Sequence, residues 1–182
     1  MNTIENINIF IEDLGLIDKN IPIYDNYSYA DAFLGITSDY RAIYDYNYMV
    51  RFLAIEFASD ELNVSDVKYS EEIISSYYNE AIEFIDYNTL SAHIQREPVV
   101  LFAMEYNGED SVEEIAENYG YDLEDADGIL DDCYASAFLG FSQNSVAVYD
   151  GEILKNLGFN ENDNVKSIIL LNKFVMKNKD VA

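Results

Sequence analysis

Cysteine, proline, tryptophan and basic residues are all scarce in this sequence of 182 residues. It contains one Cys, two Pro, no Trp and ten Lys plus Arg. The single cysteine, Cys133, excludes an internal disulfide and fits a reducing compartment. The longest apolar runs, Val99 to Met104 and Ile168 to Leu171, are too short to cross a bilayer, and no basic stretch precedes an apolar run at the N-terminus. We therefore expect a cytoplasmic protein.

Recognisable catalytic and metal-binding motifs are also lacking. There is no phosphate-binding glycine loop and no zinc-ligand spacing, and His93 is the only imidazole. A Cys133 and His93 nucleophile is disfavoured because the two residues lie in different halves of the chain. An EF-hand over 122–128 fails because placing Gly128 at loop position 6 puts Leu123 and Tyr134 where carboxylates are needed. No cofactor is predicted, and loose divalent-cation binding by clustered carboxylates stays open.

What the chain has in excess is negative charge. Thirty-five Asp plus Glu give a formal net charge of −25, while 49% apolar and 14% aromatic content predicts a folded chain. Such self-repulsion works against a compact state. A polyanion is repelled by free DNA, RNA and anionic membranes but is attracted to proteins with positive grooves. The charge therefore predicts a basic, nucleic-acid-binding protein as partner.

An internal repeat is the clearest feature of the organisation. The segment Tyr29 to Asp45 is echoed by Tyr134 to Asp150 at a shift of 105 residues, with nine of seventeen positions identical. Upstream, Glu12 and Gly15 map onto Glu117 and Gly120 at the same shift. This self-similarity indicates a duplicated supersecondary unit.

Each copy is predicted to contain a short helix followed by a β-hairpin. Ser111 to Glu114 forms a capping box, and Gly120 and Gly15 stand where a left-handed residue ends a helix. The runs 32–37 and 41–44, and 137–141 and 146–149, read as paired strands. Asp45 and Asp150 are predicted to cap the helices that follow.

The copies are expected to diverge after the hairpin. The first adds a helix at about 70–86, a short helix at 90–94 and a strand at 99–104, whereas the second goes almost directly to a strand at 167–175. The predicted fold is α+β: two tandem helix and β-hairpin modules, 1–106 and 107–182, with short amphipathic helices packed on small mixed sheets. The boundary is placed at the polar segment 107–110.

The segments 32–35, 41–46, 49–50, 80–89 and 98–100 read AFLG, RAIYDY, MV, EAIEFIDYNT and PVV. In this pattern the first hundred residues resemble small phage and mobile-element proteins of low-GC Gram-positive bacteria. Some acidic phage proteins of this size are anti-CRISPR inhibitors of type II-A effector nucleases. The resemblance therefore implies a counter-defence protein acting in the host cytoplasm on an effector nuclease with its guide RNA. The second copy lacks a counterpart of 80–89.

Carboxylates are the predicted partner-binding groups. One set follows a helical phase in the first copy, and the other belongs to a run from Glu105 to Asp132 that holds twelve carboxylates and no Lys or Arg. A solvated face is the competing interpretation. Exposed tyrosines near the first hairpin are predicted to add contacts. The predicted partner-binding residues are Glu72, Glu83, Asp86, Glu113, Glu117, Asp122, Glu124, Asp125, Asp127, Asp131, Asp132, Tyr40, Tyr46 and Tyr48.

Three functions remain open at this point. The leading one is a non-enzymatic inhibitor whose acidic surface imitates nucleic acid in a basic groove. The second is a nuclease that truncates the guide RNA, with Mg²⁺ held by carboxylates such as Asp45, Glu83 and Asp86. The third is a DNA-mimic antirestriction protein, which differs from the first only in its target.

Overall fold

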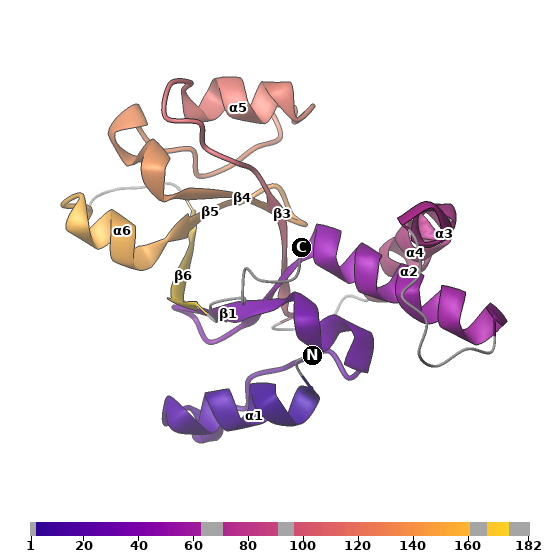
Figure 1. The fold of residues 1–182 in the computed structure, drawn as a ribbon. Helices are drawn as coiled ribbons and strands as arrows, with labels where there is room; N and C mark the ends of the chain where they lie inside the picture. Colours follow the sequence, from indigo (N-terminus) through magenta and orange to yellow (C-terminus); the bar gives the residue numbers. More distant parts are fainter. Residues whose placement is uncertain (1–2, 63–70, 91–96, 161–166, 175–182) are drawn as a thin grey trace.

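The computed structural model describes residues 3–62, 71–90, 97–160 and 167–174. Helices surround a central set of strands (Figure 1). The first copy contains α1 (Ile4–Asp13), the 3-10 turns η1 (Ile17–Lys19) and η2 (Tyr27–Ala32), β1 (Phe33–Thr37), β2 (Ala42–Asp45), α2 (Tyr46–Leu62), α3 (Glu71–Ser76), α4 (Tyr78–Phe84), the π-helical turn η3 (Ile85–Leu90) and β3 (Val99–Ala103). The second contains α5 (Val112–Asn118), η4 (Asp132–Ala137), β4 (Phe138–Ser142), β5 (Ala147–Asp150), α6 (Gly151–Asn156) and β6 (Ile169–Phe174).

The six strands close into one barrel in the order β1-β2-β3-β4-β5-β6. The prediction of a mixed α+β fold is confirmed, but the prediction of small mixed sheets is wrong. Each copy supplies three strands. The two sets are joined by two antiparallel pairs of edge strands, β3 with β4 and β6 with β1. Closure satisfies the backbone groups that two small sheets would leave unpaired at their edges.

The two hairpins have the same register. Each carries one irregularity at the same point of the first strand, just before its glycine. Every pair recurs at the shift of 105: Phe33 with Tyr44, Gly35 with Ile43 and Ile36 with Ala42 in the first copy; Phe138 with Tyr149, Gly140 with Val148 and Phe141 with Ala147 in the second. The two predicted hairpins are therefore confirmed, and the duplication extends to individual strand pairs.

A parallel crossover follows each hairpin. β2 pairs with β3, and β5 with β6, in parallel, which requires a connection over the outside of the barrel. In the first copy α2, α3, α4 and η3 lie in this connection, whereas in the described residues of the second, 151–160 and 167–168, the one helix is α6. These described residues contain no counterpart of α3 and α4.

The helix ends follow the predicted local signals. Ser111 and Glu114 form the capping box of α5, and Asp150 accepts hydrogen bonds from the first backbone N–H groups of α6. Asp45 accepts a 3.1 Å hydrogen bond from the N–H of Tyr48. The glycines that follow α1 and α5 have φ of +68° and +79°, a conformation that favours glycine.

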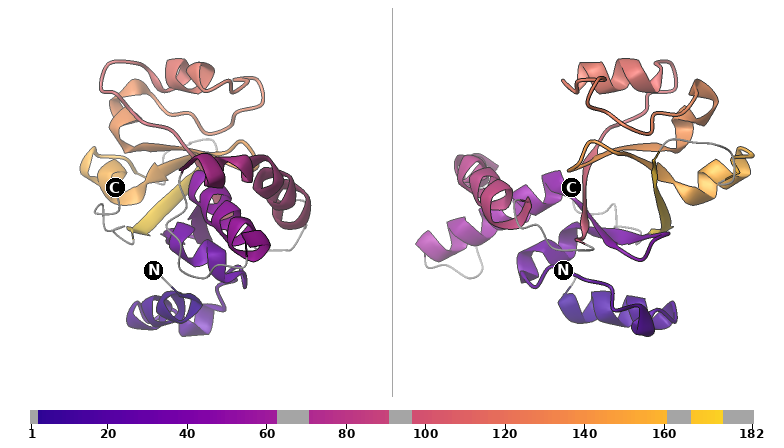
Figure 2. Two further views of the ribbon diagram at one scale, coloured as in Figure 1. Left: turned by 45° about the vertical axis from the view of Figure 1, so that its right-hand side comes forward. Right: turned by 180° about the vertical axis from the view of Figure 1, so that it is seen from behind.

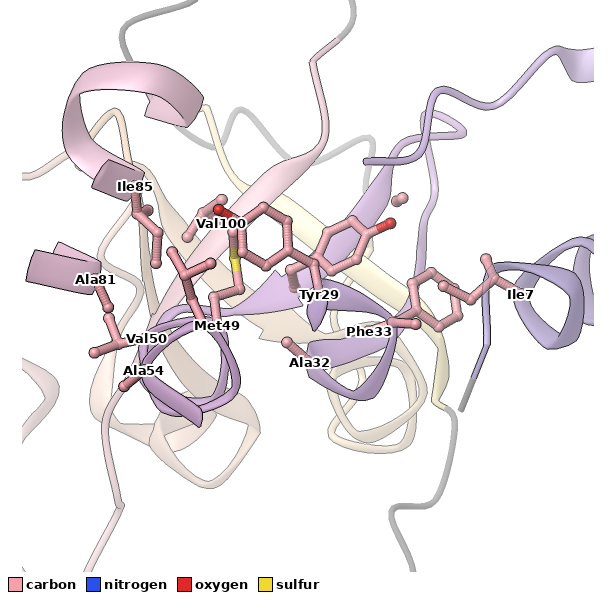
Figure 3. Packing of buried hydrophobic residues seen from close by; sticks show 14 of the residues in the cluster. Ile7, Tyr29, Ala32, Phe33, Met49, Val50, Ala54, Ala81, Ile85 and Val100 are labelled. Atoms are coloured by element: carbon pink, nitrogen blue, oxygen red, sulfur yellow. The ribbon is translucent and has the colours of Figure 1, made fainter. Parts of the chain in front are cut away.

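The barrel interior is filled by matched aliphatic residues from both copies. Leu34, Ile43, Val99, Leu101, Val148, Ile169 and Leu171 form this cluster. On β2 and β5 the neighbours of Ile43 and Val148 point outward instead, because successive strand residues alternate between faces. They join one outer core per copy, beneath the helices of that copy. Figure 3 shows the outer core of the first copy, where Ala81 and Ile85 lie opposite Val50 and Ala54 of α2.

The predicted helix at 70–86 differs in detail from the structure. It is broken at Tyr77 into α3 and α4, and η3 continues the chain after Phe84. Ser70, and all of the predicted short helix at 90–94 except Leu90, lie outside the described residues. The boundary segment 107–110 lies between β3 and α5. Within the ranges given above, no helix has both the length and the hydropathy needed to cross a bilayer.

Candidate functional site

The two predicted acidic sets lie on different parts of the molecule. Glu72, Glu83 and Asp86 are exposed on α3, α4 and η3, whereas the other set lies on and after α5. The views in Figures 1 and 2 agree that α3 and α4 project from one side of the barrel while α5 covers another. The structure therefore does not bring the two sets together into one continuous surface.

The acidic set of the second copy is exposed with one exception. Glu113 and Glu117 lie on α5, and Asp131 and Asp132 lie at the start of η4. Asp127 is half-buried, and its backbone holds a parallel bridge to Val146: its N–H donates to Ser145 at 2.9 Å and its carbonyl accepts from Ala147 at 2.7 Å. Asp127 therefore has a structural role. The remaining exposed members of this set are Asp122, Glu124 and Asp125.

Tyr46 and Tyr48 mainly complete local packing. The ring of Tyr46 stacks on Phe102 at a centroid distance of 4.5 Å, and its hydroxyl donates to Asp86 at 3.1 Å. Burial, with the charge of Asp86 added, raises the pKa of Tyr46 to about 12. Tyr48 is exposed and stacks on Phe52 at 6.0 Å.

Tyr40 occupies the turn of the first hairpin in a left-handed conformation, with φ of +64°. The ammonium nitrogen of Lys19 lies 5.1 Å from the centre of its ring, a cation–π distance. A positively charged group therefore lies over the ring of Tyr40, whereas the two predicted acidic sets present carboxylates.

Two depressions of the described surface lie beside η3. An open depression of about 690 Å³ is lined by Glu80, Glu83, Phe84, Asp86, Tyr87 and Asn88. A second depression of about 390 Å³ shares Phe84 and Asn88 with the first and reaches inward to Tyr24, Tyr29 and Thr89. We call the second depression the inner cleft; the rest of its described lining is Pro22, Ile23, Asp25, Asn26, Glu97 and Pro98.

Local backbone geometry explains why η3 lines both depressions. α4 ends in a π-helical turn. Such turns are rare in proteins, and where they occur they are often part of a functional site. Ile85 is fully buried in the outer core while Tyr87, two residues later, is 80% exposed. The turn therefore anchors the chain on one side and presents Asp86, Tyr87 and Asn88 on the other.

Aromatic rings form the floor of the inner cleft. Tyr24 meets Tyr29 edge-on at 5.7 Å and Tyr44 at 5.0 Å. The hydroxyls of Tyr29 and Thr89 share a hydrogen bond of 3.2 Å. Burial, followed by the charge of Glu97, raises the pKa of Tyr24 well above its usual range, so this hydroxyl stays protonated at neutral pH.

The charged residues among the described lining of the two depressions are all acidic. Asp25 and Glu97 line the inner cleft, and Glu80, Glu83 and Asp86 line the open depression. Neither depression has a Lys or Arg among its described lining residues. Sequence reasoning found Glu83 and Asp86 by their helical phase, but it missed Tyr24, Tyr29, Phe84, Asn88 and Glu97, which only the tertiary fold brings together.

The groups considered for metal or nucleophile chemistry are dispersed. Asp45 is buried and caps α2, whereas Glu83 and Asp86 are exposed on the α4 and η3 segment. Across the part of the chain that the structure describes, no group of three His, Cys, Asp or Glu side chains is placed to hold a metal ion. Cys133 is exposed, and His93 lies outside the described residues.

No protein-family model, curated protein sequence or solved structure gives a significant match to this chain. The functional argument therefore depends on the charge and geometry described above.

Proposed function

We propose that this protein is a non-enzymatic inhibitor that binds the basic nucleic-acid groove of a partner protein through its carboxylates. The observation that carries the proposal is the imbalance of charge, −25 over 182 residues, displayed on helices around a closed barrel. Three of its basic side chains are already engaged in ion pairs: Arg41 with Asp39 at 2.7 Å, Arg51 with Glu71 at 2.6 Å and Lys19 with Asp18 at 3.8 Å.

The scaffold supports this role because it fixes the carboxylates in space. A polyanion that imitates nucleic acid must hold its charges against their mutual repulsion, and three hydrophobic clusters supply the opposing stability. The resemblance to acidic phage proteins makes a type II-A CRISPR effector nuclease with its guide RNA the target to test first. A restriction enzyme would satisfy the same physics.

Salt dependence and competition test the proposal. Association with the effector and guide complex should slow as salt rises, because the Debye length shrinks to about 10 Å at 0.1 M and long-range attraction is screened. Target DNA or free guide RNA should compete, since two polyanions repel each other within one basic channel. If binding is indifferent to salt and to both competitors, the proposal is wrong.

Matched charge reversals identify the acidic set that makes the contact. One variant carries Glu113→Lys, Glu117→Lys and Asp131→Lys, and the other carries Glu72→Lys, Glu83→Lys and Asp86→Lys. Both change the net charge equally at exposed positions, so a general loss of attraction slows both alike. A larger loss in one variant assigns the contact to that surface, and the other set is then a solvated face.

Guide-RNA integrity separates the inhibitor from the alternative of a metal-dependent nuclease. Incubation with effector and guide, with Mg²⁺ or with EDTA, should leave the RNA at full length. A shortened product that appears only with Mg²⁺ would replace the inhibitor proposal with the nuclease.

A further inference from the structure

The inner cleft belongs to the first copy alone. Tyr24 and Leu130 are equivalent, because the backbone N–H of each donates to the tyrosine hydroxyl of its own hairpin. In the second copy Leu130 packs into the outer core and is only 8% exposed. In the first copy the same stretch places Tyr24 and Asp25 on the wall of an open cleft. The second copy thus fills this space with an apolar side chain, whereas the first copy leaves it accessible.

The far wall of the cleft comes from the segment that the second copy lacks. Phe84, Asn88 and Thr89 lie at the end of α4 and in η3. Since the barrel closes beside α6 without such a segment, closure does not require these residues. Phe84 nevertheless remains 39% exposed, although a ring of that size is stabilised by burial. The ring of Phe84 also packs edge-on against Phe57 at a centroid distance of 5.8 Å, which fixes it in place beside the cleft.

The lining combines aromatic faces with carboxylates, and this combination selects the ligand. Nucleic acid is disfavoured because Asp25 and Glu97 would face its phosphates. A hard metal ion is disfavoured because it prefers a shell of oxygens to aromatic rings. A guanidinium group is favoured, because it stacks on aromatic faces, pairs with carboxylates through its planar fork and is less strongly hydrated than an ammonium.

We propose that the inner cleft receives an arginine side chain of the basic partner protein, with its guanidinium paired to the carboxylate of Asp25, its stem against Phe84 and Tyr24, and the negative charge of Glu97 nearby adding to the attraction. The inference depends on the proposed function, which supplies a partner rich in such side chains. The volume of about 390 Å³ lies within the range of about 300–1,000 Å³ that is usual for ligand sites. Glu80, Glu83 and Asp86 in the adjoining depression would attract further basic residues of the same segment.

The test uses a blocked pentapeptide with a central arginine flanked by glycines, and the same peptide with citrulline, which keeps the shape and removes the charge. Amide NMR spectra of the full chain are recorded at about 10 mM peptide, where even a millimolar site is filled. The arginine peptide should shift amide signals from 22–29 and 84–89, and the citrulline peptide should not. Absence of shifts, or equal shifts over α5 and η4, would overturn the inference.

Two cleft variants and one control give the test its specificity. Asp25→Asn with Glu97→Gln removes the charges, and Asn88→Met fills an exposed entrance without changing charge or adding an aromatic face. Each should weaken the arginine peptide about tenfold or more, as expected for lost hydrogen bonds to a charged group. Glu109→Gln with Glu152→Gln makes the same charge change at exposed positions of the second copy outside the predicted partner-binding set, and should leave the affinity within about twofold. An equal loss in this control, or normal binding by Asn88→Met, would contradict a cleft site.

The partner-binding assay distinguishes this inference from the proposed function. If the cleft variants lose the peptide but bind the effector complex with unchanged affinity, the cleft is not the contact and the acidic-inhibitor proposal stands. If the wild-type chain binds the arginine peptide in the cleft but no basic nucleic-acid-binding protein, the proposed function fails instead. Loss of both in the cleft variants, with the control unaffected, supports the inference.

Discussion

Replacing Tyr149 by phenylalanine perturbs one buried atom that both repeats use in the same way. The Tyr149 ring is fully buried on β5, and its hydroxyl accepts a 2.9 Å hydrogen bond from the N–H of Leu130. In the first copy the hydroxyl of Tyr44 accepts from the N–H of Tyr24 at 3.2 Å. Each tyrosine thus ties the segment before its hairpin to the second strand of that hairpin.

The expected loss of stability follows from the donor that is left behind. Phenylalanine keeps the ring, so little apolar contact is lost, but the N–H of Leu130 remains buried without an acceptor. An unsatisfied buried donor costs about 1–3 kcal/mol. Tyr24 is only half-buried and lines an open cleft, so water can replace the lost partner there. Tyr44→Phe should therefore cost less, about 0.5–1.5 kcal/mol.

Urea unfolding measures both variants against the wild-type chain. With a slope of about 1–3 kcal/mol per molar urea, Tyr149→Phe should lower the midpoint by roughly 1 M and leave the slope unchanged. Tyr44→Phe should shift it by less. A Tyr149→Phe midpoint equal to that of the wild type, or the reverse order of the two variants, would refute the reasoning, because the hydroxyl would then not satisfy a buried donor.

The same residue makes stability depend on alkaline pH. Burial is the main cause that raises the pKa of Tyr149 to about 12, from about 10 in an unfolded chain. The folded state therefore favours the neutral phenol. Its contribution is fully present below pH 10 and is lost as pH rises from about 10 through 12. Between those values the free energy of unfolding should fall less steeply for Tyr149→Phe than for the wild type.

Two further substitutions test the barrel and the helix caps. A Cβ at Gly140 would overlap the carbonyl oxygen of Phe102 on the neighbouring strand, so Gly140→Ala should lose at least about 1–3 kcal/mol by thermal or urea unfolding. The control Gly108→Ala, with open space around the new methyl group, should lose only the roughly 1–2 kcal/mol of its positive φ. Asp150→Ala removes hydrogen bonds to the first N–H groups of α6 and should cost about 1 kcal/mol, while Asp150→Asn should retain most of the stability. Equal stability of Asp150→Ala and Asp150→Asn would show that the cap does not contribute.

Local sequence signals predicted the parts of the fold that depend on near neighbours. The repeat located both hairpins, and the capping residues Ser111 and Asp150 marked the starts of helices that the structure confirms. These features are encoded within a few residues by turn chemistry, side-chain alternation and capping bonds. The same signals predicted one continuous helix in the first copy, because the helical pattern continues through Tyr77, but the helix breaks at that residue.

Closure of the barrel and the inner cleft were not predictable in this way. The pairings of β3 with β4 and of β6 with β1 join strands of different copies, and strand alternation indicates which face is buried but not which strand is adjacent. The cleft likewise joins residues near 24 with residues near 88, some 60 positions apart. Periodicity found Glu83 and Asp86 on the helix, but it carried no information about the aromatic wall opposite them.

The difference between the repeats indicates where selection for function acts in this molecule. Both copies meet the same structural demands: a hairpin of identical register, a buried tyrosine hydroxyl on a backbone donor and a parallel third strand. The second copy meets them with α6 and an apolar stretch around Leu130. The first adds α3, α4 and η3 and leaves Phe84 and Tyr87 exposed. Exposed aromatic rings contribute less to the stability of the fold than buried ones. Because both copies experience the same folding requirements, this addition supports the proposal that a partner is recognised at the first copy, with the carboxylates around α5 increasing the long-range attraction.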